Sequence, residues 1–313
     1  MLTNVPRSLT PLGLCLFLAA CGGSSSTDMT EQNNPVTDAN VTIPFAAVVN
    51  ASNDTISCDT PLTGLGTAGT NASLEDFRFY VHNIVLTTSG GRELPLSLEQ
   101  SDFQNGGVAL LDFQNRANKC AGDPKPVNTS VTGTIPLRDA ERVAGLSFTV
   151  GVPEDLNHRN TATADTPLNI ASLFWNWQGG YKFMRLDIAP QDGIARPGDA
   201  TFNSTAWNIH LGSTACTGDP EVGETVVCDR PNRVTIDFPQ FDRDTQTVAL
   251  DYGALIGSAN VALDNGGAPG CMSGATDPEC PSVAAALALD LNSGEMDPGA
   301  NQTSFRLINT ADL

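Results

Sequence analysis

Two tryptophans two residues apart, Trp175 and Trp177, form the most distinctive aromatic feature of the chain, in the segment Phe174–Phe183 (FWNWQGGYKF). Residues two apart on a β-strand face the same side. The pair could therefore pack in the core or stack on a ligand such as a sugar ring. An intact indole offers only an N–H donor and is no metal ligand. Metal binding would have to involve other donors.

The chain has 3 histidines, which are the next candidates for chemistry. His82 lies in an alternating segment, His158 lies in a polar segment (PEDLNHRN), and His210 closes an apolar run just before Gly212. Imidazoles that are scattered in sequence can converge in a fold, and imidazole suits copper, zinc or nickel. A hydrogen-bonded structural role for each histidine is the alternative that spacing leaves open.

The N-terminus resembles a bacterial lipoprotein signal. Arg7 precedes the short apolar run 12–18, and Leu18-Ala19-Ala20-Cys21 fits a lipobox. The run is too short to span a membrane permanently, which predicts cleavage before Cys21 and lipid attachment to its sulfur. An ordinary secretory signal is the alternative. Gly22 after the lipidated cysteine favours the outer membrane of a Gram-negative-type envelope, on its periplasmic side or at the cell surface.

Six cysteines remain after Cys15 leaves with the signal and Cys21 takes the lipid. An exported compartment is oxidising, so an even number predicts disulfides, although six cysteines allow fifteen pairings. No C-x-x-C pair suggests a zinc or iron–sulfur site. Pairing of neighbours along the chain would give Cys58–Cys120, Cys216–Cys228 and Cys271–Cys280.

No catalytic motif is present. The sequence lacks G-x-S-x-G, a haem C-x-x-C-H and a phosphate-binding loop. The acidic stretch from Asp290 resembles the start of a calcium loop, but Asn301 stands where an EF-hand needs glutamate. We therefore predict a protein that is not an enzyme, and a hydrolase using two carboxylates is the remaining enzymatic alternative.

The net charge of -19, from 16 basic and 35 acidic residues, is unfavourable for binding nucleic acid or anionic lipid. We expect no nucleic-acid partner and membrane contact only through the lipid anchor. Hydrophobic residues make up 40% of the chain, which is enough for a substantial core. The protein should therefore be an ordered domain on a polar tether.

Many short apolar runs separated by glycine and proline predict strands. In 76–87, Phe77, Phe79 and Val81 should share one face, and Arg78, Tyr80, His82 and Ile84 the other. The remaining strands are expected at 41–50, 108–113, 130–137, 146–152, 173–188 (two, broken near Gly179-Gly180), 206–211, 233–238 and 247–252. Helical patterns occur only at 282–291 and, more weakly, 138–143.

These elements predict an all-β fold, an antiparallel β-sandwich with disulfide-stapled loops and at most one or two short helices. The domain organisation follows from composition. We assign 1–20 to the signal peptide, 21–40 to a flexible tether rich in Gly, Ser, Thr, Asn and Asp, and 41–313 to one β domain.

Several segments, in their order along the chain, resemble the MbnP-like family, the four-Cys, WxW proteins of the metallo-mystery pair. The matching segments are Phe79-Tyr80-Val81, Leu110-Leu111-Asp112-Phe113, Trp175-x-Trp177 with Gly180-Tyr181-x-Phe183, His210-Leu211-Gly212-Ser213, Pro269–Gly274 (PGCMSG) and Asp277–Cys280 (DPEC). The resemblance runs over about 43–290.

This resemblance implies an exported copper-binding protein that is paired with a di-haem peroxidase-like enzyme resembling MbnH. In the family the partner oxidises a tryptophan to kynurenine, whose aromatic amine and ketone supply the lone pairs that indole lacks. By matching motifs, Trp175 or Trp177 is the modification candidate. His210 ranks first as a copper ligand, His82 second and His158 third. The family's disulfides would fall on the six cysteines named above.

The leading hypothesis is therefore an exported lipoprotein that binds copper for acquisition, storage or handover. The alternative is a binding module without metal, in which Trp175 and Trp177 form a stacking platform for a glycan or protein partner.

Overall fold

The computed structural model describes residues 35–116, 120 and 122–313. The predicted signal peptide, the lipidation site Cys21 and most of the predicted tether lie outside the described residues. The first strand, β1 (Val36–Val48), begins five residues before the predicted domain boundary. Residues 36–40, expected in the tether, therefore belong to a strand that pairs along its length with β8 (Ser130–Arg138).

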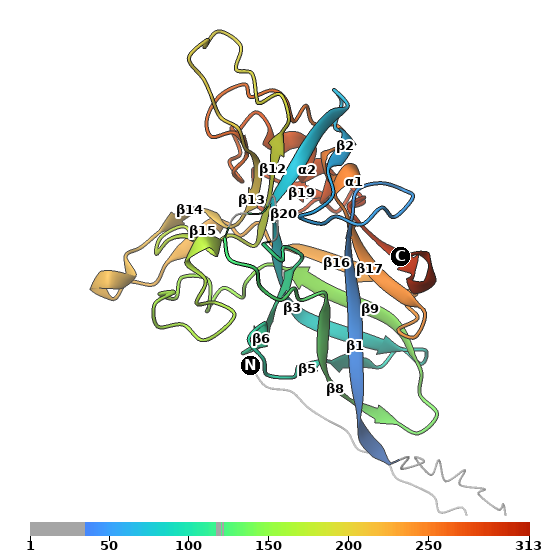
Figure 1. The fold of residues 1–313 in the computed structure, drawn as a ribbon. Coiled ribbons are helices and arrows are strands. Elements are labelled where there is room, and N and C mark those ends of the chain that lie inside the picture. Colours follow the sequence, from blue (N-terminus) through green and yellow to red (C-terminus); the bar gives the residue numbers. More distant parts are fainter. Residues whose placement is uncertain (1–34, 117–119, 121) are drawn as a thin grey trace, which may run out of the picture. The chain divides into compact units, whose positions relative to one another are not determined.

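Two sheets form the fold (Figure 1). The smaller sheet has the strand order β21 (Phe305–Asn309), β17 (Gln246–Asp251), β1, β8 and β5 (Ser97–Leu98). The larger sheet has the order β16 (Val234–Phe238), β9 (Val143–Val150), β3 (Thr70–Thr88), β12 (Met184–Pro190), β13 (Trp207–Leu211) and β18 (Gly270–Cys271). It also contains β2 (Leu62–Leu65), β4 (Glu93–Pro95), β7 (Val108–Asp112) and β6 (Gln104–Asn105).

The main core lies between the two sheets. Phe45 of β1 lies edge-on to Phe79 of β3 and Phe148 of β9, with ring centroids 6.2 and 5.5 Å apart. Phe305 of β21 contacts the same two rings from the smaller sheet. This face-to-face packing confirms the predicted all-β sandwich. Most pairings are antiparallel, while β1–β17 and β13–β18 are parallel.

The side chains of the long strand β3 alternate as predicted only as far as the irregularity near Asn83. Phe77, Phe79 and Val81 lie in the core as predicted. Ile84 also lies in that core, although alternation put it on the opposite face. The pairing of β3 with β9 shifts register between His82 and Val85, and Asn83 has φ 49°. Such an irregularity reverses the side on which the following residues point.

Smaller elements complete the domain. They are the hairpins β10 (Phe174–Asn176) with β11 (Gly180–Tyr181), β14 (Thr214–Thr217) with β15 (Val227–Arg230), and β19 (Leu289–Asp290) with β20 (Glu295–Met296). The helices are α1 (Tyr252–Ile256) and α2 (Cys280–Ala286), and 3-10 turns cover Ala171–Leu173, Pro220–Val222 and Thr310–Asp312.

Both predicted helices need correction. The helix expected at 282–291 corresponds to α2, which begins at Cys280 and ends at Ala286. Leu289 and Asp290, which were expected in the helix, form β19 instead. The weak helix at 138–143 is the turn between β8 and β9, closed by the bond from Glu141 N to Arg138 O at 3.1 Å. Ala140 has φ 66°, which a continuing α-helix excludes.

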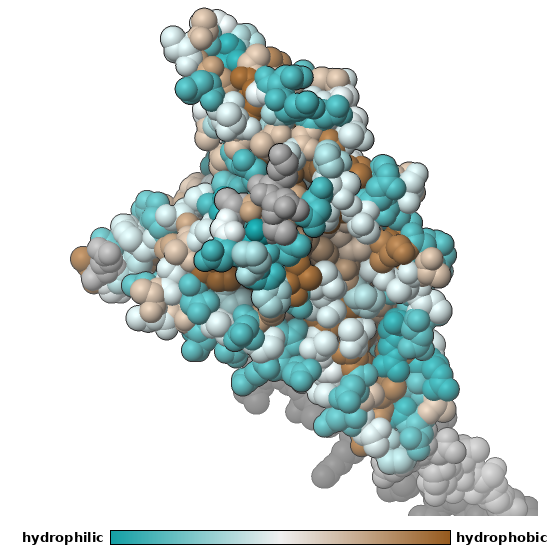
Figure 2. Space-filling model, viewed as in Figure 1, coloured by the Kyte–Doolittle hydropathy of each residue, from teal (hydrophilic) through white to brown (hydrophobic). Residues whose placement is uncertain are grey.

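The described residues contain three disulfides, which join neighbouring cysteines along the chain: Cys58–Cys120, Cys216–Cys228 and Cys271–Cys280. Disulfides of this number are typical of proteins in oxidising compartments outside the cytoplasm. No helix in the described part of the chain is long and apolar enough to cross a membrane. On the face shown in Figure 2, apolar residues form small groups separated by polar ones.

Candidate metal centre

Charged side chains gather on the face of the larger sheet that points away from the core. In the pairing of β12 with β13, Arg185 lies opposite His210 and Asp187 opposite Asn208. In the pairing of β12 with β3, Asp187 lies opposite Asp76. Directly opposed residues share a face, so these five side chains belong to one surface of the sheet. The strands therefore bring His210 beside two carboxylates.

His210 is held by one of these carboxylates. Its Nε2 lies 2.9 Å from Oδ1 of Asp187, and the His210 residue is 8% exposed. Burial alone would raise the pKa of Asp187, but the hydrogen bond from His210 and the charge of Arg185 hold it below its ordinary value. An ionised Asp187 accepts a proton-bearing Nε2, which leaves the lone pair of the neutral imidazole on Nδ1.

A second ion pair supports this arrangement from β3. Arg78 and Asp76 are joined by two hydrogen bonds and are 1% and 3% exposed. Arg185 bridges the two carboxylates, with its Nε 3.2 Å from Asp76 Oδ2 and 2.7 Å from Asp187 Oδ2. The carboxylate that orients His210 is thus itself held in place by a fixed guanidinium.

Trp175 lies next to this face. A Cβ on Gly212 would be 2.6 Å from Cζ3 of the Trp175 ring, so the indole packs directly on the Gly212 backbone. Gly212 is two residues beyond His210, and alternation puts both on the same side of the chain. The turn before β10 is tied to the same face, because Arg185 Nη1 donates to Ser172 O at 3.3 Å.

Trp175 and Trp177 do not share a face, contrary to the alternation expected for a continuous strand. β10 ends at Asn176, and Trp177 lies in the turn to β11. Trp175 lines a pocket of about 490 Å³ together with Ser213, Cys216 and Met272. Trp177 lines a different pocket, of about 510 Å³. The two half-buried rings therefore do not form a joint stacking platform.

Met272 brings a soft donor to the Trp175 pocket. Cys271 pairs in parallel with Ile209, and continuing this register past the end of β18 puts Met272 level with His210. The next residue, Ser273, is fully buried and donates to His210 O at 2.7 Å. A thioether and an aromatic ring thus line one pocket, and His210 lies on the strand that pairs with β18.

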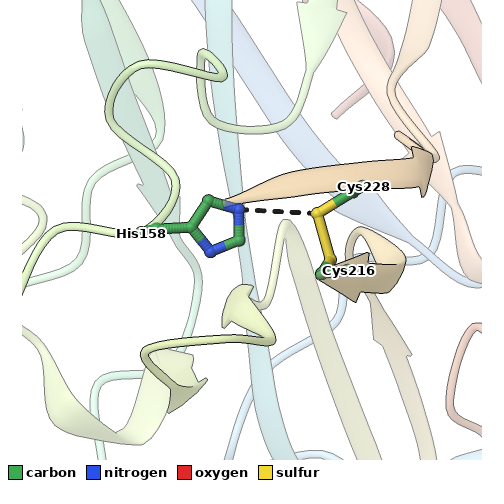
Figure 3. Close-up of side chains that lie close together, drawn as sticks. All are labelled: His158, Cys216 and Cys228. Carbon is green, nitrogen blue, oxygen red and sulfur yellow. Dashed lines mark hydrogen bonds between the residues drawn. A yellow bond between two sulfur atoms is a disulfide. The ribbon is translucent and has the colours of Figure 1, made fainter. Parts of the chain in front are cut away.

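His158 lies in the second pocket, with Trp177. Its Nδ1 is 3.0 Å from Trp177 O, and its Nε2 is 3.2 Å from Asn157 Nδ2. Figure 3 shows that Nε2 also faces Cys228 Sγ, at 3.5 Å. Burial lowers the pKa of His158, while the bond to the Trp177 carbonyl opposes that shift. Both ring nitrogens are engaged, and the adjacent sulfur is in the Cys216–Cys228 disulfide.

His82 lies further along β3, where it pairs with Thr149 and Val108. Burial lowers the pKa of His82 to about 4, and the positive charge of Arg233 contributes a smaller part of this decrease. Its Nε2 is buried without a hydrogen-bond partner in the described structure. The one group of three His, Cys, Asp or Glu ligand atoms found among the described residues contains His158. The three histidines therefore do not converge.

Trp207 has a different environment from the other two tryptophans. It is fully buried in the main core, and its Nε1 has no hydrogen-bond partner in the described part of the chain. Oxygen insertion into this ring would disturb the packing of the sandwich.

The donor set around His210 fits copper. Imidazole and thioether are ligands that copper accepts, and a carboxylate behind the imidazole is the usual support of a metal-bound histidine. The indole of Trp175 is the member of this group that lacks a lone pair.

Comparisons with known proteins identify the family of the chain. A family model described as MbnP matches residues 38–273. The chain belongs to the MbnP family. The solved structure of MbnP from Methylosinus trichosporium is 34% identical, with a TM-score of 0.80, and the match covers 88% of this chain and 100% of that one. No curated protein matches the chain.

The sequence analysis does not predict two residues of the candidate centre. Met272 lies in the matched segment Pro269–Gly274 without being predicted as a donor, and Asp187 lies outside the matched segments. Asp187 could have been found from Arg185-x-Asp187, because charged residues alternating with Leu186 and Ile188 indicate a strand with a polar face.

Proposed function

We propose that this MbnP-family protein binds copper through His210 and a kynurenine formed from Trp175. The observation that carries the proposal is the packing of the Trp175 ring on Gly212, beside the face that holds His210 and Asp187. Met272, level with His210, is the third donor. The role is acquisition, storage or handover of the ion, and the protein is not an enzyme.

The tryptophan must be changed before it can bind a metal. Addition of two oxygen atoms across the indole C2–C3 bond, with two molecules of hydrogen peroxide reduced to water, gives N-formylkynurenine. Hydrolysis then releases formate and leaves an aromatic amine and a ketone. We propose that a di-haem peroxidase-like partner resembling MbnH supplies the oxidising equivalents. Trp175 is suited to this step because it is half-buried at a pocket, whereas Trp207 is enclosed.

Trp175 with His210 is preferred over Trp177 with His158 for a geometric reason. Nδ1 of His158 donates to the Trp177 carbonyl. Its Nε2 lies within 3.5 Å of the Asn157 amide and of the disulfide sulfur of Cys228. Within the described part of the chain, the imidazole of His210 has a hydrogen-bond partner only at Nε2. A copper ion at His158 Nε2 would have to displace the Asn157 amide, whereas an ion at His210 Nδ1 would displace no hydrogen bond found among the described residues.

We further propose that the protein is anchored by lipid on Cys21, in the outer membrane of a Gram-negative-type envelope. The lipobox and the three disulfides support export. The domain itself needs no membrane contact for copper binding, because the donors lie within residues 175–272.

Mass spectrometry with copper titration tests the proposal. The protein is produced with and without its di-haem partner, and the peptide containing Trp175 and Trp177 is sequenced. We expect a gain of about 4 Da on Trp175 and about one Cu(I) per chain only with the partner. Trp175→Phe should lose both, the matched variant Trp177→Phe should keep both, and His210→Gln should keep the mass gain and lose copper. Equal copper binding by Trp175→Phe would overturn the proposal.

A further inference from the structure

The Cys216–Cys228 disulfide differs from the other two in accessibility. Both of its cysteines are half-buried, whereas Cys58 is 2% and Cys271 3% exposed. It joins directly opposed residues of β14 and β15, a hairpin that projects beside the two sheets (Figure 1). A solvent-borne thiol can therefore approach this disulfide while the core disulfides stay protected.

A histidine faces this disulfide. The Nε2 of His158 and the two sulfurs all lie within 4.8 Å of one another (Figure 3). The distance from Nε2 to Cys228 Sγ is 3.5 Å. A tetrahedral ion with a metal–sulfur bond of about 2.3 Å and a metal–nitrogen bond of about 2.0 Å separates its ligand atoms by about 3.5 Å. His158 Nε2 and Cys228 Sγ are therefore separated by the distance expected for two ligands of one tetrahedral ion.

The surroundings set the tautomer of His158 that a metal needs. Nδ1 lies 3.0 Å from the Trp177 carbonyl, which can only accept, so Nδ1 carries the proton and the lone pair of the neutral ring is on Nε2. Asn157 holds the loop in place, because its Oδ1 accepts from Tyr181 N at 3.0 Å. That lone pair faces both the Asn157 Nδ2 amide, at 3.2 Å, and Cys228 Sγ, at 3.5 Å, so a metal ion at Nε2 takes the place of the amide contact.

The base of the hairpin is fixed by contacts other than the disulfide. Asn232 Nδ2 donates to Gly212 O at 2.8 Å, and Ser213 Oγ donates to Pro231 O at 2.9 Å. Gly294 packs against Arg230, where a Cβ on the glycine would be 2.5 Å from the arginine Cα. These contacts keep both cysteines near His158 when the sulfur–sulfur bond is broken.

We propose that Cys216–Cys228 is a reducible disulfide whose two thiolates, with Nε2 of His158, bind one soft transition-metal ion, Cu(I) or Zn(II). A dithiol reductant supplies two electrons and two protons, the sulfur–sulfur bond breaks, and the reductant leaves as its own disulfide. Metal binding then releases the two thiol protons. In the oxidised protein the sulfurs are joined to each other and the site is closed. This ligand set includes neither Trp175 nor His210, although Cys216 also lines the pocket of Trp175.

Thiol counting and cobalt titration test the proposal on the mature chain, cleaved before Cys21 and lipidated on it, produced without the di-haem partner. After mild treatment with a phosphine reductant and its anaerobic removal, we expect two reactive thiols per native chain, mapped to Cys216 and Cys228. Co(II), used as the probe ion, should then bind at about one per chain, with a sulfur-to-cobalt charge-transfer band and the intense visible bands of tetrahedral geometry. The oxidised protein should show neither feature.

Three variants test which side chains hold the ion. His158→Gln keeps both thiols and should weaken Co(II) binding by at least about tenfold. His210→Gln should leave Co(II) binding unchanged, because it belongs to the other site. Cys216→Ser with Cys228→Ser should abolish the charge-transfer band. Absence of native-state thiols, or equal Co(II) affinity in wild type and His158→Gln, would overturn the proposal whatever happens at the copper site.

Discussion

The indole of Trp175 occupies the space that any side chain on Gly212 would need. An added Cβ would be 2.6 Å from Cζ3 of the ring and 2.6 Å from the backbone oxygen of Tyr181. The ring can move, but the backbone of Tyr181 in β11 cannot move without disturbing the hairpin that carries Trp175. The glycine thereby determines where the tryptophan lies relative to His210.

Gly212→Ala should displace Trp175 and destabilise the domain. Overpacking of this kind costs about 1–3 kcal/mol in free energy of unfolding. We expect a lower melting temperature, altered tryptophan fluorescence, and a smaller yield of kynurenine in the presence of the di-haem partner. Gly90→Ala is the control, because an added Cβ there meets nothing closer than 3.8 Å. Equal melting temperatures for the two variants would contradict the close packing described for Trp175.

Asp187→Asn should weaken copper binding without removing a proposed ligand. The amide can present its NH₂ or its carbonyl to His210, so the preference for a proton on Nε2 is lost. Loss of such a supporting carboxylate lowers metal affinity by about 10–100-fold. The measurement is competition for Cu(I) with a chromophoric chelator, on protein whose Trp175 has been oxidised. Asp237→Asn, an exposed aspartate of β16, controls for the change in charge. Unchanged affinity in Asp187→Asn would show that His210 binds no copper.

The strands were predictable because their pattern is local. Alternation located β3, and apolar runs bounded by turn residues located β7, β8 and β9. The face of Ile84 was not predictable, because it depends on the irregularity at Asn83, where β3 changes register against β9. The end of α2 at Ala286 was missed for a similar reason, since β19 forms by pairing with β20.

The candidate centre was predictable only as single residues. Motif resemblance selected His210 and either Trp175 or Trp177, but no sequence spacing shows that Asp187 lies 2.9 Å from His210, because they come from different strands. The separation of Trp175 from Trp177 depends on where β10 ends, which is set by its pairing with β11. Local pattern thus gave the candidates, and tertiary pairing selected among them.

The buried pair of Asp76 and Arg78 should be essential for stability. Both side chains are nearly inaccessible, and Arg78 Nη1 has no partner among the described residues. Asp76→Asn leaves the guanidinium buried without its main counter-charge, which costs about 3–5 kcal/mol. Chemical denaturation should show this as a lower midpoint. Asp102→Asn, at an exposed turn, is the control and should change the midpoint little. A small effect of Asp76→Asn would mean that Asp187 alone can balance Arg78 and Arg185.

His82 should make the domain sensitive to mild acid. Burial and the charge of Arg233 lower its pKa in the folded protein to about 4, from 6.5 for an exposed histidine. Between these values the unfolded chain binds a proton that the folded chain does not, so stability falls as the pH decreases from about 6.5 to about 4. The contribution of one such group is at most about 1.4 kcal/mol per pH unit. Denaturation midpoints over this range should therefore fall less steeply for His82→Gln than for the wild type. Parallel pH profiles would show that His82 is protonated equally in both states.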